Sequence, residues 1–337
     1  MKNINSQKVK DFLINNGVII IMVILVIYTG ITSNNFISSN NLFNILNNMS
    51  SRLVIALGIA GCVITAGCDL SAGRMIGFGG CIAGTLLQKL DYSNKFYPDM
   101  EPLNVFLVLL IVILICGFFG AITGFFIAFL NVPPFIATLA MMEIVYGINL
   151  IYTDATPLGG YVTDYTDFAK APSIFANIPI LNRITSLIWI AVLIAVITYF
   201  IFNYTRHGKY MYAIGGNPQA AEVAGVPVKT TMILIYMKAA MFYGLAGFML
   251  GAKAGGASVN LGLGYEMEAI AACTIGGVSV TGGRGKVSSA IVGVAVFELL
   301  KAALQYNGVD ANAQYIALGV IIFIAISLDI RKYVAKK

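Results

Sequence analysis

The sequence predicts an all-α, polytopic membrane protein with about ten transmembrane helices. Of its 337 residues, 58% are hydrophobic and only 11% are charged, and the mean hydropathy is +0.85. Soluble globular domains carry about 25% charged residues. Two further observations support this fold class: apolar segments of membrane length recur along the chain, and lysine and arginine are distributed unevenly around them. No linker long enough to separate domains appears, so we expect a single transmembrane domain over residues 1–337.

A transmembrane helix needs about 20 predominantly apolar residues, and fewer where other helices surround it. Ten segments qualify as spans, and the eighth is so short that we expect protein rather than lipid around it. In chain order they are 16–32, 49–66, 72–88, 103–130, 134–152, 186–203, 230–252, 265–280, 287–305 and 314–329.

Ten spans place both chain ends on one side of the membrane. With a basic lead-in at 1–15 in the cytoplasm, thirteen of the 21 lysine and arginine residues fall in inner segments and five in outer segments. Positive residues concentrate on the cytoplasmic side of membrane proteins. The charge distribution therefore predicts cytoplasmic termini and a cytoplasmic loop at 204–230.

That cytoplasmic loop contains a short helix with a signal at each end. Asn217 is a good N-cap, and Pro218 suits the first helical position because its missing N–H costs nothing there. Gly225 suits a left-handed C-terminal position, and Pro227 stops the helix. So short a helix is not stable alone in water. It is either an ordinary interfacial loop helix or an element that docks against a partner.

Two polar breaks interrupt the spans at membrane depth, where polar groups are costly unless satisfied. Asp69 and Ser71 lie between the second and third spans, while Asn260 and Glu266 lie between the seventh and eighth. The span count puts these breaks on opposite sides of the membrane, as an inverted repeat of spans 2–5 and 7–10 would. For Asp69 and Ser71 we favour helix capping over contact with cargo.

Other charges within spans suggest a polar path or ion pairs. Glu143 is in the middle of a span, where no capping role explains it, so it should face a polar pathway or a partner such as Lys238. Glu298 and Lys301 are three residues apart on one predicted helix and can pair. The candidate translocation path comprises Asp69, Ser71, Glu143, Asn149, Asn260 and Glu266.

The sequence contains no recognisable set of catalytic residues. The five cysteines have no zinc-ligand spacing, and the single His207 has no matching catalytic set. Lys286 resembles the end of a P-loop, but Val287 replaces the required serine or threonine. We therefore expect no metal, no cofactor and no nucleic acid partner.

Four separated motifs, in order, resemble permease subunits of ribose/galactose-type ABC sugar importers over nearly the whole chain. Within this family, the segments 86–88, 93–100 and 144–149 resemble the galactose/methyl-galactoside branch. The four motifs are TAGCDLSAGR at 65–74, PFIATL at 134–139, GGNPQAAEVAG at 215–225 and AIAACTIGG at 269–277.

The resemblance implies a type II ABC importer in the bacterial plasma (inner) membrane. It implies a homodimer with a translocation path along its two-fold axis, ATPase subunits that bind ATP and Mg, and an extracytoplasmic sugar-binding protein. Glu143 departs from the neutral residue usual in such permeases. The cytoplasmic segment corresponds to the family's ATPase-coupling helix, namely Gly216, Asn217, Pro218, Gln219, Ala220, Ala221, Glu222, Val223, Ala224 and Gly225.

The resemblance favours a monosaccharide as cargo, namely galactose, methyl galactoside or glucose. A nucleoside, ribose or xylose importer of the same family is the alternative. An ion-coupled secondary transporter is a further reading, and it would need charged groups at the midplane that bind H⁺ or Na⁺. Glu143 is the one strong candidate for such a group.

Overall fold

A computed structural model describes residue 20, residues 22–170 and residues 183–334 of the chain. Its described residues form helices joined by loops, and the two β-bridges, Gln88–Tyr161 and Leu158–Ala257, are isolated. The all-α prediction is therefore confirmed. The predicted lead-in at 1–15 lies outside the described residues.

The helices follow the predicted apolar segments. An apolar helix spans Met22–Thr32. The others are α2 (Ser39–Ile64), α3 (Ala72–Leu86), α4 (Val105–Phe129), α5 (Pro134–Thr153), α6 (Thr163–Lys170), α7 (Ser186–Tyr204), α8 (Arg206–Gly216), α9 (Pro218–Val223), α10 (Val228–Ala254), α11 (Tyr265–Gly276), α12 (Val287–Tyr306) and α13 (Ala311–Val334).

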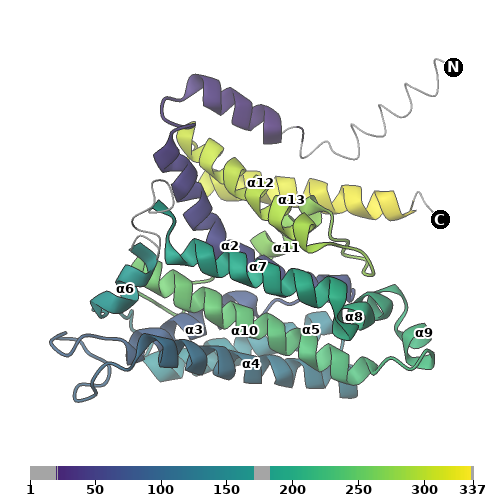
Figure 1. Cartoon of the computed structure of the whole chain (residues 1–337), viewed down its shortest axis with the longest axis horizontal. Helices are drawn as coiled ribbons and strands as arrows, with labels where there is room; N and C mark the ends of the chain where they lie inside the picture. The colour runs from purple at the N-terminus through teal and green to yellow at the C-terminus, as the bar shows by residue number, and fades with distance from the viewer. Residues whose placement is uncertain (1–19, 21, 171–182, 335–337) are drawn as a thin grey trace.

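Six of the described helices are long and apolar enough to cross a membrane, namely α2, α4, α5, α7, α10 and α12. The other four predicted spans coincide with Met22–Thr32, α3, α11 and α13. These four are not among the six, so the predicted total of ten spans is not confirmed. Figure 1 shows the axes of α4, α7 and α10 roughly aligned, with α8 and α9 at one end of the molecule and α6 at the other.

The centre of the fold is formed by α2 and α10. In their most apolar windows, 78% of α2 and 67% of α10 is buried, against 28% of α4, so α4 lies on the outside. Glycines let α4 approach α10 closely: a Cβ on Gly124 would lie 2.6 Å from the Cα of Ile233. Small residues at this spacing are typical of closely packed membrane helices. The Gly120 and Gly124 pair therefore packs within one subunit.

Each central helix packs against a pair of helices from the other half of the chain. Helix α10 packs on α3 and α4, while α2 packs on α11 and α12. Within each half, α3 contacts α5, and α11 contacts α13. The start of α3 is buried, since Asp69 and Ser71 are each 2% exposed.

Candidate functional site

The two short helices α3 and α11 begin next to each other. They contain 15 and 12 residues, or roughly 22 and 18 Å, and the hydrocarbon core is about 30 Å thick. A Cβ on Gly73, in the first turn of α3, would lie 2.1 Å from Oε2 of Glu266, in the first turn of α11. Both breaks therefore end where these half-length helices meet, and their placement on opposite sides of the membrane stays a prediction.

Asp69 holds the start of α3. Its Oδ1 accepts from the backbone N–H of Ser71 (3.0 Å) and from the Ser71 hydroxyl (2.6 Å), and its Oδ2 accepts from the hydroxyl of Tyr243 on α10 (3.2 Å). Ser71 makes no side-chain cap bond to α3. Asp69 therefore acts as the cap, and Ser71 serves it as a donor.

Glu266 lies between the N-terminal ends of two helices. It is the second residue of α11, and its carboxylate reaches the first turn of α3 at Gly73. Helix N-termini carry partial positive charge from their unpaired N–H groups. Two such ends together favour a buried carboxylate at this position, which explains how the membrane interior tolerates Glu266.

Arg74 joins the second break and α5 to the same junction. Its Nη1 donates to Oδ1 of Asn260 (2.7 Å), and its guanidinium lies 3.8 Å from the ring centroid of Tyr146. One helical turn further along α5, Asn149 is buried beside the thiol of Cys81 on α3. Five of the six candidate path residues therefore lie along α3 or at its start, whereas Glu143 does not.

Glu143 lies on the outer face of α5. It is exposed in the single chain, and so are Ile136 and Ile151 on the same helix, while a Cβ on Gly147 would meet open space. The suggested pairing with Lys238 is wrong: the described residues contain no such ion pair, and the Lys238 ammonium lies 5.0 Å from the Phe202 ring centroid.

Helix α9 has the predicted ends. The side chain of Asn217 accepts from the N–H of Ala220 (2.9 Å), Pro218 is the first residue of α9, and Gly225 has φ +82°. Ala221 faces the permease and is 5% exposed, while Val223 is 91% exposed. The helix therefore presents an apolar side chain away from the subunit.

The sequence did not predict that four charged residues from three helices form a cluster. Arg52 of α2 pairs with Glu298 of α12 and lies 3.4 Å from Glu268 of α11, while Lys301 of α12 pairs with Glu268 at 2.5 Å. The predicted pairing of Glu298 with Lys301 is therefore wrong, because each binds an ion of another helix. All four charged residues occur within apolar segments of the sequence, and this pattern indicates that they need partners inside the bundle.

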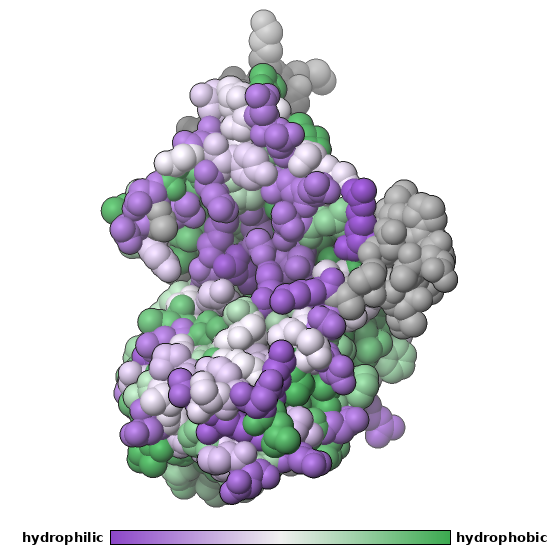
Figure 2. All heavy atoms as spheres, turned by 90° about the vertical axis from the view of Figure 1, so that its left-hand side faces the viewer, coloured by the Kyte–Doolittle hydropathy of each residue, from purple (hydrophilic) through white to green (hydrophobic). Residues whose placement is uncertain are grey.

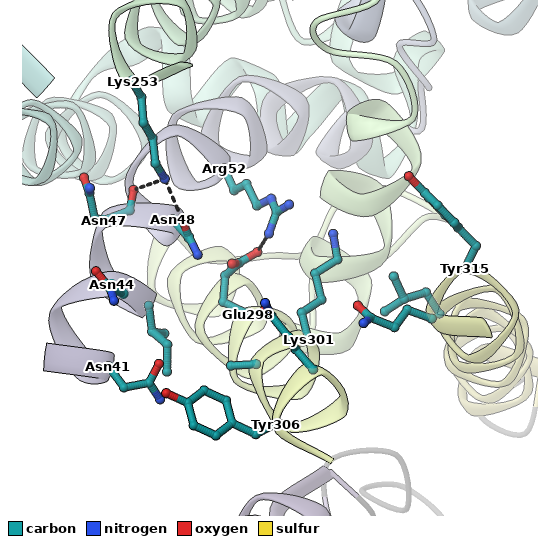
Figure 3. Close-up of a pocket in the computed structure, with 15 residues that line it drawn as sticks. Asn41, Asn44, Asn47, Asn48, Arg52, Lys253, Glu298, Lys301, Tyr306 and Tyr315 are labelled. Atoms are coloured by element: carbon teal, nitrogen blue, oxygen red, sulfur yellow. Dashed lines mark hydrogen bonds and ion pairs between the residues drawn. The ribbon is translucent and has the colours of Figure 1, made fainter. Parts of the chain in front are cut away.

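This cluster forms the floor of a polar cavity of about 780 Å³ between α2, α12 and α13. Figure 2 views the end of the molecule opposite α9, where hydrophilic side chains gather in a hollow. Figure 3 shows Asn41, Asn44, Asn47 and Asn48 on one side of the cavity and the Arg52–Glu298 pair at its base. The sequence analysis singled out Glu298 and Lys301 but neither Arg52 nor these four asparagines.

Known proteins resemble the chain over its full length. The family described as "Branched-chain amino acid transport system / permease component" matches residues 41–326. The galactose/methyl galactoside import permease protein MglC of Escherichia coli (strain K12) is 40% identical over 340 residues, covering all of both chains. The protein of the same name from Haemophilus influenzae is 39% identical over 340 residues. The ribose import permease protein RbsC of Escherichia coli (strain K12) is 30% identical over 325 residues, 96% of each chain. No solved structure matches the chain.

Proposed function

Because the chain belongs to the permease family described as "Branched-chain amino acid transport system / permease component", we propose that it is the membrane permease subunit of an ATP-driven ABC importer. We propose galactose or methyl galactoside as its cargo. The proposed cargo rests on the 40% identity to a galactose/methyl galactoside import permease over the whole of both chains. Ribose is the second candidate, supported by the 30% identity to a ribose import permease.

The permease offers a sugar a route that lipid cannot. A sugar in hydrocarbon loses the hydrogen bonds of its hydroxyls to water, and each unsatisfied polar group costs about 2–7 kcal/mol. The junction of α3 and α11 brings together Asp69 and Glu266, which are buried, and Asn260, which is exposed in the single chain. Broken helices at membrane depth are tolerated where they are enclosed by protein or line a cavity. These residues are therefore our candidates for the path.

Helix α9 is the proposed contact with a cytoplasmic ATPase subunit, which binds ATP and Mg and hydrolyses the nucleotide. The support is its geometry: both ends are capped, Ala221 anchors it to the permease, and Val223 remains exposed. A rigid helix that is fixed on one face can transmit motion of the ATPase to the spans. Cytoplasmic termini are part of the same proposal, and in Figure 1 α13 runs toward the end that carries α9.

A homodimer joined along α5 accounts for Glu143. A charged side chain in the middle of a lipid-facing helix costs about 2.5–3.5 kcal/mol on insertion scales. A second copy packed against this face, with a water-filled path between the copies, removes the charge from lipid. Gly147, one turn from Glu143, leaves room for such an approach.

An inverted repeat of spans 2–5 and 7–10 is supported by the packing of the helices. If α2 to α5 correspond to α10 to α13, the contacts of α10 with α3 and α4 have their counterparts in those of α2 with α11 and α12. The contact of α3 with α5 corresponds to that of α11 with α13. A pseudo-two-fold axis in the membrane plane then passes between the starts of α3 and α11.

Reconstitution tests this function. The chain is placed in proteoliposomes with an ATPase subunit and an external sugar-binding protein, and uptake of labelled galactose is measured. We expect uptake that stops when either ATP or the binding protein is omitted, with ribose carried more slowly. Uptake that is driven by an ion gradient without ATP would instead identify an ion-coupled transporter.

A further inference from the structure

We propose that the polar cavity between α2, α12 and α13 is a binding site for a neutral monosaccharide, one in each subunit, where cargo rests on the extracytoplasmic side of the path. This inference rests on the proposed function, which supplies the cargo and the direction of import. None of the predicted path residues lines this cavity. It is therefore a separate site from the junction of α3 and α11.

One wall of the cavity is a row of carboxamides on α2. Asn41, Asn44 and Asn48 are spaced i, i+3 and i+7, which places them on one face of a helix. Amides are costly against lipid, so this face of α2 must meet water, protein or ligand. A carboxamide both donates and accepts hydrogen bonds, as does a sugar hydroxyl. The lining also includes Gln305, Tyr306, Gln314 and Tyr315, with Tyr306 beside Asn41 and Tyr315 across the cavity (Figure 3).

Most of these groups are held in place by the protein. Asn41 donates to the carbonyl of Phe36 (2.7 Å), Asn47 accepts from Thr185 (2.9 Å), and Asn48 accepts from Lys253 (2.5 Å). Asn44 is exposed, and its side chain forms no hydrogen bond with another described residue. Its amide is therefore available to a ligand within a wall that is otherwise fixed.

The charges around the cavity favour a neutral ligand. Arg52 and Lys301 are engaged by Glu298 and Glu268, and Lys253 is engaged by Asn48. An ionic cargo would have to compete with these contacts, whereas a sugar can bind the amides and leave them intact. The volume of about 780 Å³ falls within the range of about 300–1,000 Å³ that is usual for small-molecule sites.

The floor of the cavity stops the ligand in this conformation. Beyond Arg52 and Glu298 lies a pocket of only about 10 Å³, lined also by Tyr265 and Phe297. Such a space holds about one water molecule. A sugar that enters from outside therefore stays above the ion pairs until Arg52 and Glu298 separate, which makes the cavity a waiting position for cargo.

The test fills the cavity in the complete importer. Asn44→Trp places a large ring in the cavity, and Leu42→Trp places the same ring on α2 at a position that is exposed but does not line the cavity. We expect Asn44→Trp to lower ATP-dependent galactose uptake at least tenfold, with Leu42→Trp within twofold of wild type at equal membrane abundance. Wild-type uptake by Asn44→Trp would overturn the proposal.

If both tryptophan variants lose uptake because they fold poorly, a second measurement tests whether the cavity binds sugar. Asn44→Cys, in a chain whose five native cysteines are replaced, is labelled from outside with a membrane-impermeant thiol reagent. Protection by galactose, but not by an equal concentration of a neutral amino acid, supports the site, and an unchanged labelling rate overturns it. This assay does not require transport. If wild-type importer takes up no sugar, the proposed function fails separately.

Discussion

At the level of single residues, the buried side chains of Asp69 and Glu266 and the partly buried Arg52 each meet a group from another helix. Asp69 is bound by Ser71 and Tyr243, and Arg52 is bound by Glu298. Glu266 is placed between two helix starts. An unpaired charge at such depth is strongly destabilising, so each of these residues depends on partners far away in the sequence.

Removal of Arg52 tests this dependence. Arg52→Met leaves Glu298 and part of Glu268 without a counter-ion, and breaking a buried ion pair costs about 3–5 kcal/mol. We expect a clearly lower unfolding midpoint of the purified chain in nanodiscs, and recovery of most of the loss in Arg52→Met/Glu298→Leu. If the double variant were less stable than Arg52→Met, the destabilisation would have another source.

The meeting of α3 and α11 is tested at Gly73. In Gly73→Ala the new Cβ would lie 2.1 Å from the Glu266 carboxylate and 2.7 Å from the carbonyl oxygen of Gly262, so the helices must separate. We expect a loss of at least about 1–3 kcal/mol, as for other overpacked sites. The control is Gly319→Ala on α13, where the added methyl meets open space and stability should not fall. Equal stability of the two variants would argue against the contact.

At the level of elements, each helix can be related to local signals and each exposed face to a partner. Helix α9 begins and ends where Asn217, Pro218 and Gly225 predict. Tertiary contacts determine its orientation, which buries Ala221 and exposes Val223. The proposed docking face is therefore centred on Val223, and a charge at Ala221 would test folding rather than docking.

Val223→Arg places a charge on the face of α9 that we propose docks on the ATPase. We expect at least a tenfold loss of transport-coupled ATP hydrolysis with an unchanged unfolding midpoint, because the side chain is 91% exposed in the subunit. Val223→Leu keeps an apolar surface and should retain most activity. Full coupling in Val223→Arg would exclude this face as the contact.

At the level of the whole molecule, the subunit is organised around α2 and α10, each packed on helices from the other half of the chain. Its outer surface is largely apolar, as a protein in lipid requires, and includes exposed side chains of α4 such as Leu110 and Leu114. The exception in the middle of α5 is Glu143, and it distinguishes this face from the lipid-facing surface.

Cross-linking tests whether α5 joins two subunits. In a cysteine-free chain, Glu143→Cys should form an intersubunit disulfide in membranes treated with a mild oxidant, seen as a dimer on a non-reducing gel. Leu110→Cys on α4 is the lipid-facing control and should remain monomeric. Equal cross-linking of the two variants would indicate random collision, and its absence at 143 would move the interface elsewhere.

The sequence by itself determined what depends on neighbours along the chain. Hydropathy located the helices, and cap residues located the ends of α9, because both properties act within a few residues. The tertiary structure decided how distant segments combine. It brought the two breaks together, separated Lys238 from Glu143, paired Glu298 with Arg52 instead of Lys301, and formed the amide-lined cavity. Helical spacing shows which residues share a face, but only the packing of α2 on α11 and α12 shows what that face meets.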